Sequence, residues 1–178
     1  SRQKVANYAG VTVERKEGSF IGPSRRRQYR VLDLPGSYSL TPTTLDEAIT
    51  RDCLLGRLAG EPPPELVVCV VDATNLRLNL RLVLELRELG LPVIVALNMS
   101  DLALDRGYRL DRARLEQELG VPVVETVAIR DGGERALLER LETMPRAMAT
   151  SVRWGSNESS TRTQPPASQV MCVANARP

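Results

Sequence analysis

The fold is decided by one continuous stretch, residues 66–101, which reads LVVCVVDATNLRLNLRLVLELRELGLPVIVALNMSD. Its first part, Leu66 to Val71, is an unbroken apolar run, which is typical of a strand buried on both faces of a sheet. Its middle part has apolar residues at helical spacing between a capping Asn75 and Gly90, which predicts an amphipathic helix. Pro92 to Leu97 is a second buried strand. The stretch therefore predicts a strand–helix–strand unit with parallel strands.

The rest of the chain continues this alternation. Strand-like residues 9–16 and 29–34 are joined by a short, turn-rich connection, which predicts an antiparallel hairpin. Thr44 has capping-box spacing to Glu47 and opens a helix that we expect to reach about residue 59. Three more elements follow, namely a short helix from Asp111 to Gly120, a strand over 121–127 and a helix over 134–141. We therefore predict an α/β fold, a doubly wound and mostly parallel sheet with one antiparallel hairpin.

Composition excludes several classes of function. The chain has no histidine, which rules out a histidine-containing zinc site and a histidine-dependent catalytic triad. Its three cysteines are widely spaced and predict no disulfide framework, so a reducing cytoplasmic compartment fits. A net charge of +2 favours neither nucleic acid nor an anionic membrane as a partner. No apolar run approaches the ~20 residues that span a bilayer, so we expect no membrane insertion by this segment.

The first motif with chemical meaning is Asp33-Leu34-Pro35-Gly36, at the point where a strand gives way to a loop. In a nucleotide switch such an aspartate holds the Mg²⁺ shell through water, and the glycine lets its backbone N–H approach the γ-phosphate. Taken alone, an aspartate at a strand end followed by an ordinary Pro-Gly turn explains the motif about as well.

The second motif is Asn98-Met99-Ser100-Asp101, directly after the buried strand that ends at Leu97. A carboxylate at Asp101 can accept two N–H bonds from the guanine edge, which adenine cannot match. An Asn-x-x-Asp pattern alone is a weak signal. Its place at the end of a buried strand, one strand–helix–strand unit after the first motif, makes a guanine-nucleotide site the favoured interpretation.

Other residues carry weaker signals. Thr12 could give a hydroxyl to Mg²⁺, but without supporting neighbours a solvent-facing strand threonine is the favoured interpretation. Asp72 ends a buried strand just before a helix cap, and we interpret it as a local structural residue. A phosphate loop needs Gly-Lys-Ser/Thr. The two lysines, Lys4 after Gln3 and Lys16 after Arg15, cannot belong to one.

Several stretches together resemble one family, the cytoplasmic GTPase (G) domain of ferrous iron transport protein B, or FeoB. The stretches that carry the resemblance are residues 1–18, 33–40, 45–47, 70–76 with Asn79-Leu80, and 96–99. The resemblance covers residues 1 to about 142. It implies a P-loop GTPase-like fold that here lacks its first strand and helix. It also implies GTP or GDP with Mg²⁺ as cofactors.

The resemblance also implies roles for individual residues. The first switch would be formed by Gly10, Val11, Thr12, Val13 and Glu14. The second would open with Asp33, Leu34, Pro35 and Gly36, and Thr12 and Asp33 would serve Mg²⁺. The guanine-reading loop would be Asn98, Met99, Ser100 and Asp101, and the last base-contacting loop Val127, Ala128 and Ile129. No catalytic residue is assigned.

In the family so resembled, the phosphate loop and its flanking strand and helix come before the position of residue 1. That strand would lie between the strands at 29–34 and 66–72. Four or five charge-assisted hydrogen bonds, at ~1.5–3 kcal/mol each, would then be missing, so we expect the isolated chain to be impaired in GTP binding and hydrolysis. The parent protein would use this domain, joined to a membrane permease domain at the cytoplasmic face of the bacterial inner membrane, to regulate ferrous iron transport.

The domain organisation follows from the extent of the resemblance and from the composition of the later residues. We expect a partial G domain over residues 1–142 and a poorly ordered tail or linker over 143–178, where Ser, Thr, Gln, Asn and Pro are common. Val170 to Ala174 is the one late apolar stretch, and we expect it to fill the place of the missing strand. The alternative function is a non-catalytic protein-interaction module built on a G-domain remnant.

Overall fold

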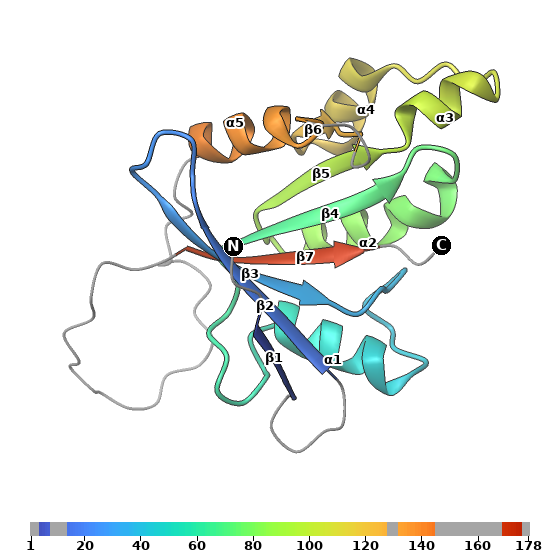
Figure 1. Ribbon diagram of the computed structural model, residues 1–178. Coiled ribbons are helices and arrows are strands. Elements are labelled where there is room, and N and C mark those ends of the chain that lie inside the picture. Colours follow the sequence, from blue (N-terminus) through green and yellow to red (C-terminus); the bar gives the residue numbers. More distant parts are fainter. Residues whose placement is uncertain (1–3, 8–13, 128–131, 145–168, 176–178) are drawn as a thin grey trace.

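Seven strands form one sheet in the computed structural model, which describes residues 4–7, 14–127, 132–144 and 169–175 (Figure 1). The strand order is β1-β2-β3-β7-β4-β5-β6. The first two pairs of neighbours are antiparallel and the other four are parallel. The strands are β1 (Lys4–Asn7), β2 (Glu14–Ile21), β3 (Gln28–Leu34), β4 (Leu66–Asp72), β5 (Val93–Asn98), β6 (Val123–Glu125) and β7 (Gln169–Asn175). This confirms the predicted fold class, a mostly parallel α/β sheet with an antiparallel hairpin.

The stretch that decides the fold forms the predicted parallel unit. β4 and β5 pair in continuous register, from Val67 opposite Val93 to Asp72 opposite Asn98. Residues 93–97 of β5 are all buried, as expected for a strand covered on both faces. The helix between the two strands is α2 (Leu76–Glu88), and Asn75 stands at its N-cap position without a side-chain capping bond.

The two faces of the sheet carry separate cores. One core joins β3, β4 and β5 to α1 (Leu45–Leu54), α2, α3 (Ser100–Asp105) and α4 (Arg112–Leu119). The other core, built around Tyr29, Val68 and Ile94, is covered by Leu141 of α5 (Arg135–Thr143). Figure 1 shows α5 on the opposite side of the sheet from α1 and α2. Among the described helices, α5 therefore covers its face alone.

The hairpin differs from the sequence expectation in its bounds. β2 runs from Glu14 to Ile21, whereas we expected a strand over 9–16, and residues 9–13 lie outside the described part. The strand continues through the polar residues because each has a partner in β3, from Lys16 opposite Asp33 to Ile21 opposite Gln28. Backbone pairing here outweighs the weak strand propensity of Gly18 and Ser19.

An ion-pair cluster supports the same hairpin. Arg30 donates to Glu17 at 2.7 Å and to Glu61 at 2.9 Å. These partners, Glu17 first, raise the pKa of Arg30 above its ordinary value, so the guanidinium stays charged. The cluster ties β2 and β3 to the loop before β4.

The first helix ends earlier than predicted. Thr44 caps it as expected, since its hydroxyl accepts from the Glu47 N–H at 3.3 Å. The Glu47 carboxylate bonds Thr43 instead of closing the box on Thr44. The helix stops at Leu54, not near residue 59, because Gly56 takes a left-handed conformation (φ 64°) that turns the chain against Pro63.

The later elements agree with the prediction in type and differ at their ends. Asp111 caps α4 through the Arg114 N–H at 3.0 Å, and Gly120 closes it at φ 66°. The strand expected over 121–127 is shorter, because β6 pairs with β5 over only three positions. The short helix α3 was not predicted.

β7 occupies the centre of the sheet. It lies parallel to both neighbours, with Leu32 opposite Cys172 on one side and Val67 opposite Cys172 on the other. This confirms the expectation that Val170 to Ala174 fills the gap between the strands at 29–34 and 66–72. The assignment of the remaining residues of 143–178 to a tail stays a prediction. None of the helices in the described ranges is both long and apolar enough to cross a membrane.

Candidate nucleotide site

The candidate site lies where parallel strands end at one edge of the sheet, which is where α/β proteins bind ligands. Asp72 and Asn98 are directly opposite each other at the ends of β4 and β5, and the Ala73 N–H donates to the Asn98 carbonyl at 2.9 Å. Asp33 closes β3 on the far side of β7. β3 and β5 are three strand spacings apart in the sheet order, which is about 14 Å. The two motifs thus share an edge but address separate points along it.

The Asp33-Leu34-Pro35-Gly36 loop and the residues after it are held by side chains from α1 and α2 and by a buried serine. Thr50 of α1, fully buried, donates from its hydroxyl to the Pro35 carbonyl at 2.7 Å. Ser37, also fully buried, donates to the Ser39 carbonyl at 2.6 Å, and Glu85 of α2 accepts from the Leu40 N–H. The loop is therefore positioned by three side chains that the sequence did not single out.

Asp33 lines a hollow of about 250 Å³ on the outer part of the sheet. It is half-buried, and Lys16 is its direct partner across the β2–β3 pair. Val31 and Phe20 supply the apolar wall of the hollow, which belongs to the core cluster under α5. The carboxylate therefore stands at the boundary between this core and the solvent.

The Asn98-Met99-Ser100-Asp101 loop contains a residue in the left-handed backbone conformation. Met99 adopts a left-handed conformation (φ 59°), which is unusual for any residue other than glycine. Its side chain is 44% exposed, so burial does not explain the conformation. The turn at Met99 starts α3, with Asp101 in its first turn accepting from the Leu102 N–H at 2.9 Å. Backbone strain of this kind concentrates at functional loops.

Other predicted site residues are only partly described. Val127 is half-buried and follows Thr126, which donates its N–H to the Leu97 carbonyl at 2.9 Å and so ties this loop to the end of β5. Ala128 and Ile129 lie outside the described residues, as do Gly10, Val11, Thr12 and Val13. Glu14 is the first residue of β2.

Asp72 at the end of β4 and Asn79 in α2 make local hydrogen bonds. Asp72 accepts from the N–H and the hydroxyl of Thr74 at 2.7 and 2.8 Å, in keeping with the predicted structural role. Asn79 of α2 is 3% exposed and donates to the Asn75 carbonyl at 2.6 Å. Its side-chain oxygen has no hydrogen-bond partner among the described residues. An unmet buried acceptor costs about 1–3 kcal/mol, and periodicity alone gave no sign of it.

The residues present fit one end of a guanine nucleotide better than the other. The base end has a strand-end asparagine and a carboxylate on a strained loop. At the phosphate end, the sequence has no Gly-Lys-Ser/Thr. Within the described ranges, no group of three or more His, Cys, Asp or Glu is placed to hold a metal ion.

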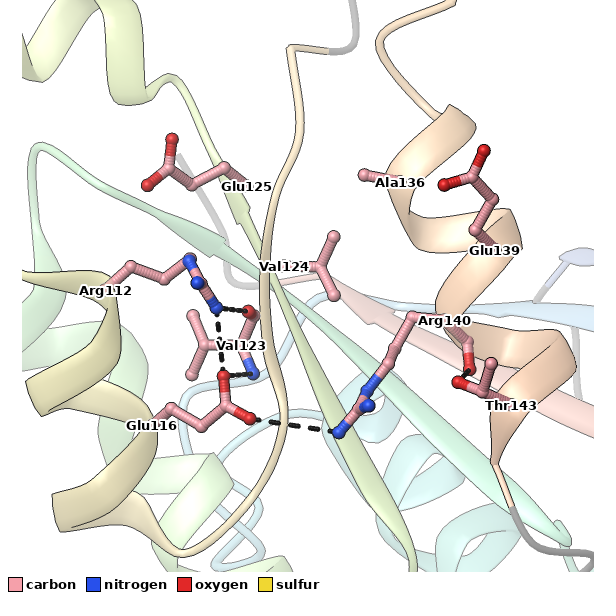
Figure 2. Close-up of a pocket in the computed structure, with 9 residues that line it drawn as sticks. All are labelled: Arg112, Glu116, Val123, Val124, Glu125, Ala136, Glu139, Arg140 and Thr143. Carbon is pink, nitrogen blue, oxygen red and sulfur yellow. Dashed lines mark hydrogen bonds and ion pairs between the residues drawn. The ribbon is translucent and has the colours of Figure 1, made fainter.

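A larger groove, of about 550 Å³, lies elsewhere, between α4 and α5 over β6. Figure 2 shows Glu116 between two arginines, hydrogen-bonded to Arg112 at 3.1 Å and ion-paired with Arg140 at 3.8 Å. Arg112 and Glu116 also bind the backbone of the edge strand β6. Arg112 donates to the Val123 carbonyl, and Glu116 accepts from the Val123 N–H. Arg112, Glu116 and Arg140 are thus paired within the molecule, and the predicted nucleotide residues are not among the residues that line the groove.

Comparisons with known proteins converge on a single family. A family model described as "Ferrous iron transport protein B" matches residues 1–141. The Fe(2+) transporter FeoB of Salmonella typhimurium is 48% identical over 141 residues, which are 77% of this chain and 17% of that protein. The chain thus spans less than a fifth of the length of this relative.

Solved structures agree with the sequence match. The cytosolic domain of L. pneumophila FeoB has a TM-score of 0.71 and 37% identity, covering 82% of this chain and 59% of that one. The cytosolic domain of the T. maritima FeoB iron transporter, in its GMPPNP form, has a TM-score of 0.67 and 40% identity, covering 80% of this chain and 52% of that one.

Proposed function

This chain belongs to the ferrous iron transport protein B (FeoB) family, and on that premise we propose that it is part of a guanine-nucleotide-binding domain that regulates ferrous iron transport. The observation that carries the proposal is the shared edge of the sheet, where β3 ends in Asp33-Leu34 and β5 ends in Asn98. A nucleoside triphosphate has its base and its terminal phosphate at opposite ends, which suits two motifs that are separated by two strands.

The proposed roles follow the family pattern. Asn98 and Asp101, with Met99 and Ser100 between them, read the guanine edge, assisted by residues 127–129. Asp33 serves Mg²⁺ together with Thr12, within a first switch over residues 10–14. Residues 1–142 form the partial G domain, β7 completes its sheet, and the remaining residues of 143–178 form a tail or linker. The parent protein acts at the cytoplasmic face of the bacterial inner membrane, where this domain partners its permease domain.

We further propose that this chain alone binds GTP weakly and does not hydrolyse it. Two observations support the proposal. The sequence has no phosphate-loop lysine, and β7 stands between β3 and β4, where the family pattern has the strand that leads into the phosphate loop. What binding remains would come from contacts to the base.

The test compares GTP with guanosine. Isothermal titration with Mg²⁺ present is expected to show no micromolar GTP binding, and saturation-transfer NMR is expected to detect guanosine and GTP with affinities within a factor of about three. Asp101→Ala should abolish both signals, while Asp105→Ala, an exposed change on the same helix, should leave them. Micromolar GTP affinity contradicts the need for the phosphate loop. Signals unaffected by Asp101→Ala contradict the guanine assignment.

A second candidate function is a protein-interaction module without catalysis. The anchoring of the loop after β3 by Thr50, Ser37 and Glu85 favours it, because a surface held in place without nucleotide is available to a partner. Partners in a pull-down that persist when both Asp33 and Asp101 are changed to alanine would support this module. Loss of those partners would assign their binding to the nucleotide site instead.

A further inference from the structure

The two halves of the sheet are joined through one strand. β3 and β4 are not neighbours in the strand order, and β7 pairs with each of them. On one side β7 runs from Tyr29 opposite Gln169 to Leu34 opposite Ala174. On the other side the register runs from Leu66 opposite Met171 to Val70 opposite Asn175. Without β7, the facing edges of β3 and β4 would be left without these backbone partners.

The place between β3 and β4 has the properties of a site for a particular kind of segment. Both of its walls are parallel strands that offer backbone hydrogen bonds along six and five positions. Leu32 of β3 and Val67 of β4, which pair with its central position, are both fully buried, while Arg30 and Asp33 of β3 pair with it nearer its ends. An extended segment that enters it must therefore be apolar and must not contain proline, which lacks a donor.

Residues 169–175 meet these requirements. Five consecutive apolar residues, Val170 to Ala174, lie between Gln169 and Asn175, without proline or glycine. Val173 is half-buried and packs against the core cluster around Tyr29, Val68 and Ile94. The residues from 145 to 168, which lie outside the described part, separate this strand from α5 along the chain.

We propose that the gap between β3 and β4 is a strand-binding site for an apolar parallel segment, that residues 169–175 of the same molecule are its resident ligand, and that a matching strand from elsewhere competes for the place. Strand addition of this kind takes its affinity from main-chain bonds and its selectivity from alternate side chains. One consequence rests on the proposed function: β7 and a strand that leads into a phosphate loop exclude each other, because both need the same two neighbours.

The first measurement locates β7 in the full-length chain by NMR. Interstrand NOEs are expected from Cys172 to both Leu32 and Val67, in the observed register. An isotope-filtered experiment on a mixture of ¹³C-labelled and ¹⁵N-labelled chains separates two cases. NOEs confined within one molecule support the proposal. NOEs between molecules, which show a strand exchanged with a second copy, or the absence of any NOEs from β7, overturn it. This outcome is independent of nucleotide binding, so it can fail while the proposed function stands.

The second measurement tests competition with a fluorescein-labelled peptide of residues 169–175. The double variant Val170→Asp/Val173→Asp of the full chain weakens the resident strand, and we expect it to bind the peptide at least tenfold more tightly than the unmodified chain does. A peptide with proline in place of Cys172 serves as the matched control and should not bind. Equal binding to both chains, or equal binding of the control peptide, contradicts a strand-specific site. If the double variant is unfolded, the NMR measurement on the unmodified chain decides the question.

Discussion

At the scale of single residues, the hydroxyl of Thr50 is the clearest support of the loop after β3. It is buried and donates to the Pro35 carbonyl at 2.7 Å. Thr50→Val leaves that carbonyl without its donor and should lower the free energy of unfolding by about 1–3 kcal/mol. Thr50→Ser keeps the hydroxyl and should cost about 1 kcal/mol for the lost methyl group. Urea unfolding measures both, and a valine variant as stable as the serine variant would contradict the role of the bond.

A glycine substitution at Met99 is expected to raise the free energy of unfolding. Its left-handed backbone (φ 59°) costs an L-residue ~1–2 kcal/mol, and its side chain is 44% exposed. Met99→Gly should therefore raise the free energy of unfolding by up to about 1 kcal/mol, since part of the gain is lost to the greater freedom of glycine in the unfolded chain. Met99→Val, whose branched side chain resists this conformation, should lower it. The reverse order in chemical denaturation would show that Met99 carries no strain.

Sequence reasoning named in advance residues whose proposed roles are chemical, and it missed residues whose roles depend on packing. Asp33, Asn98 and Asp101 belong to short motifs at strand ends, so they could be named in advance. Thr50 and Ser37 could not, because their roles depend on a carbonyl that tertiary folding brings near. The left-handed conformation of Met99 could not be predicted from the sequence either, since methionine has no preference for it.

At the scale of elements, the tip of the β2–β3 hairpin is fastened to the end of α5. Arg27 donates to the carbonyls of Leu141 and Met144 at 3.3 and 2.9 Å, which would otherwise lack helical partners. Arg27→Ala should speed amide exchange in the last turn of α5 by about tenfold, the equivalent of about 1.4 kcal/mol. Arg26→Ala, at an exposed position next to it, should leave the exchange unchanged. Equal protection of the last turn of α5 in both variants would show that the Arg27 hydrogen bonds do not stabilise it.

Elements were predictable where the pattern is local. β4, α2 and β5 follow from apolar runs and spacing, and α4 from Asp111 and Gly120. The early end of α1 was missed because it depends on the contact of Gly56 with Pro63. The short helix α3 was missed because it has only six residues, too few for a periodic signal. The place of β7 could be inferred because a family pattern showed an empty position and the late sequence held one apolar stretch.

At the scale of the whole molecule, one buried thiol couples stability to alkaline pH. Burial raises the pKa of Cys69, in the middle of β4, to about 12. An unfolded chain ionises this thiol near its ordinary pKa of about 8.5. Stability is therefore fully present below that pH and falls as the pH rises toward the folded value. Cys69→Ala should show a flatter loss of stability between about pH 8.5 and pH 10.5, measured by urea unfolding, with a constant difference at neutral pH. Identical alkaline slopes would contradict a buried neutral thiol.

The order in which the strands are synthesised affects how the nascent chain folds. The ribosome delivers β3 and β4 first, while the strand that belongs between them is more than ninety residues later than Asp72. Until β7 emerges, the facing edges of β3 and β4 have no backbone partner, a state that favours wrong pairing and aggregation. Closing such a distant contact is slow. Production of this chain should accordingly depend on chaperones that shelter unfinished sheets, and depletion of them should shift it into inclusion bodies.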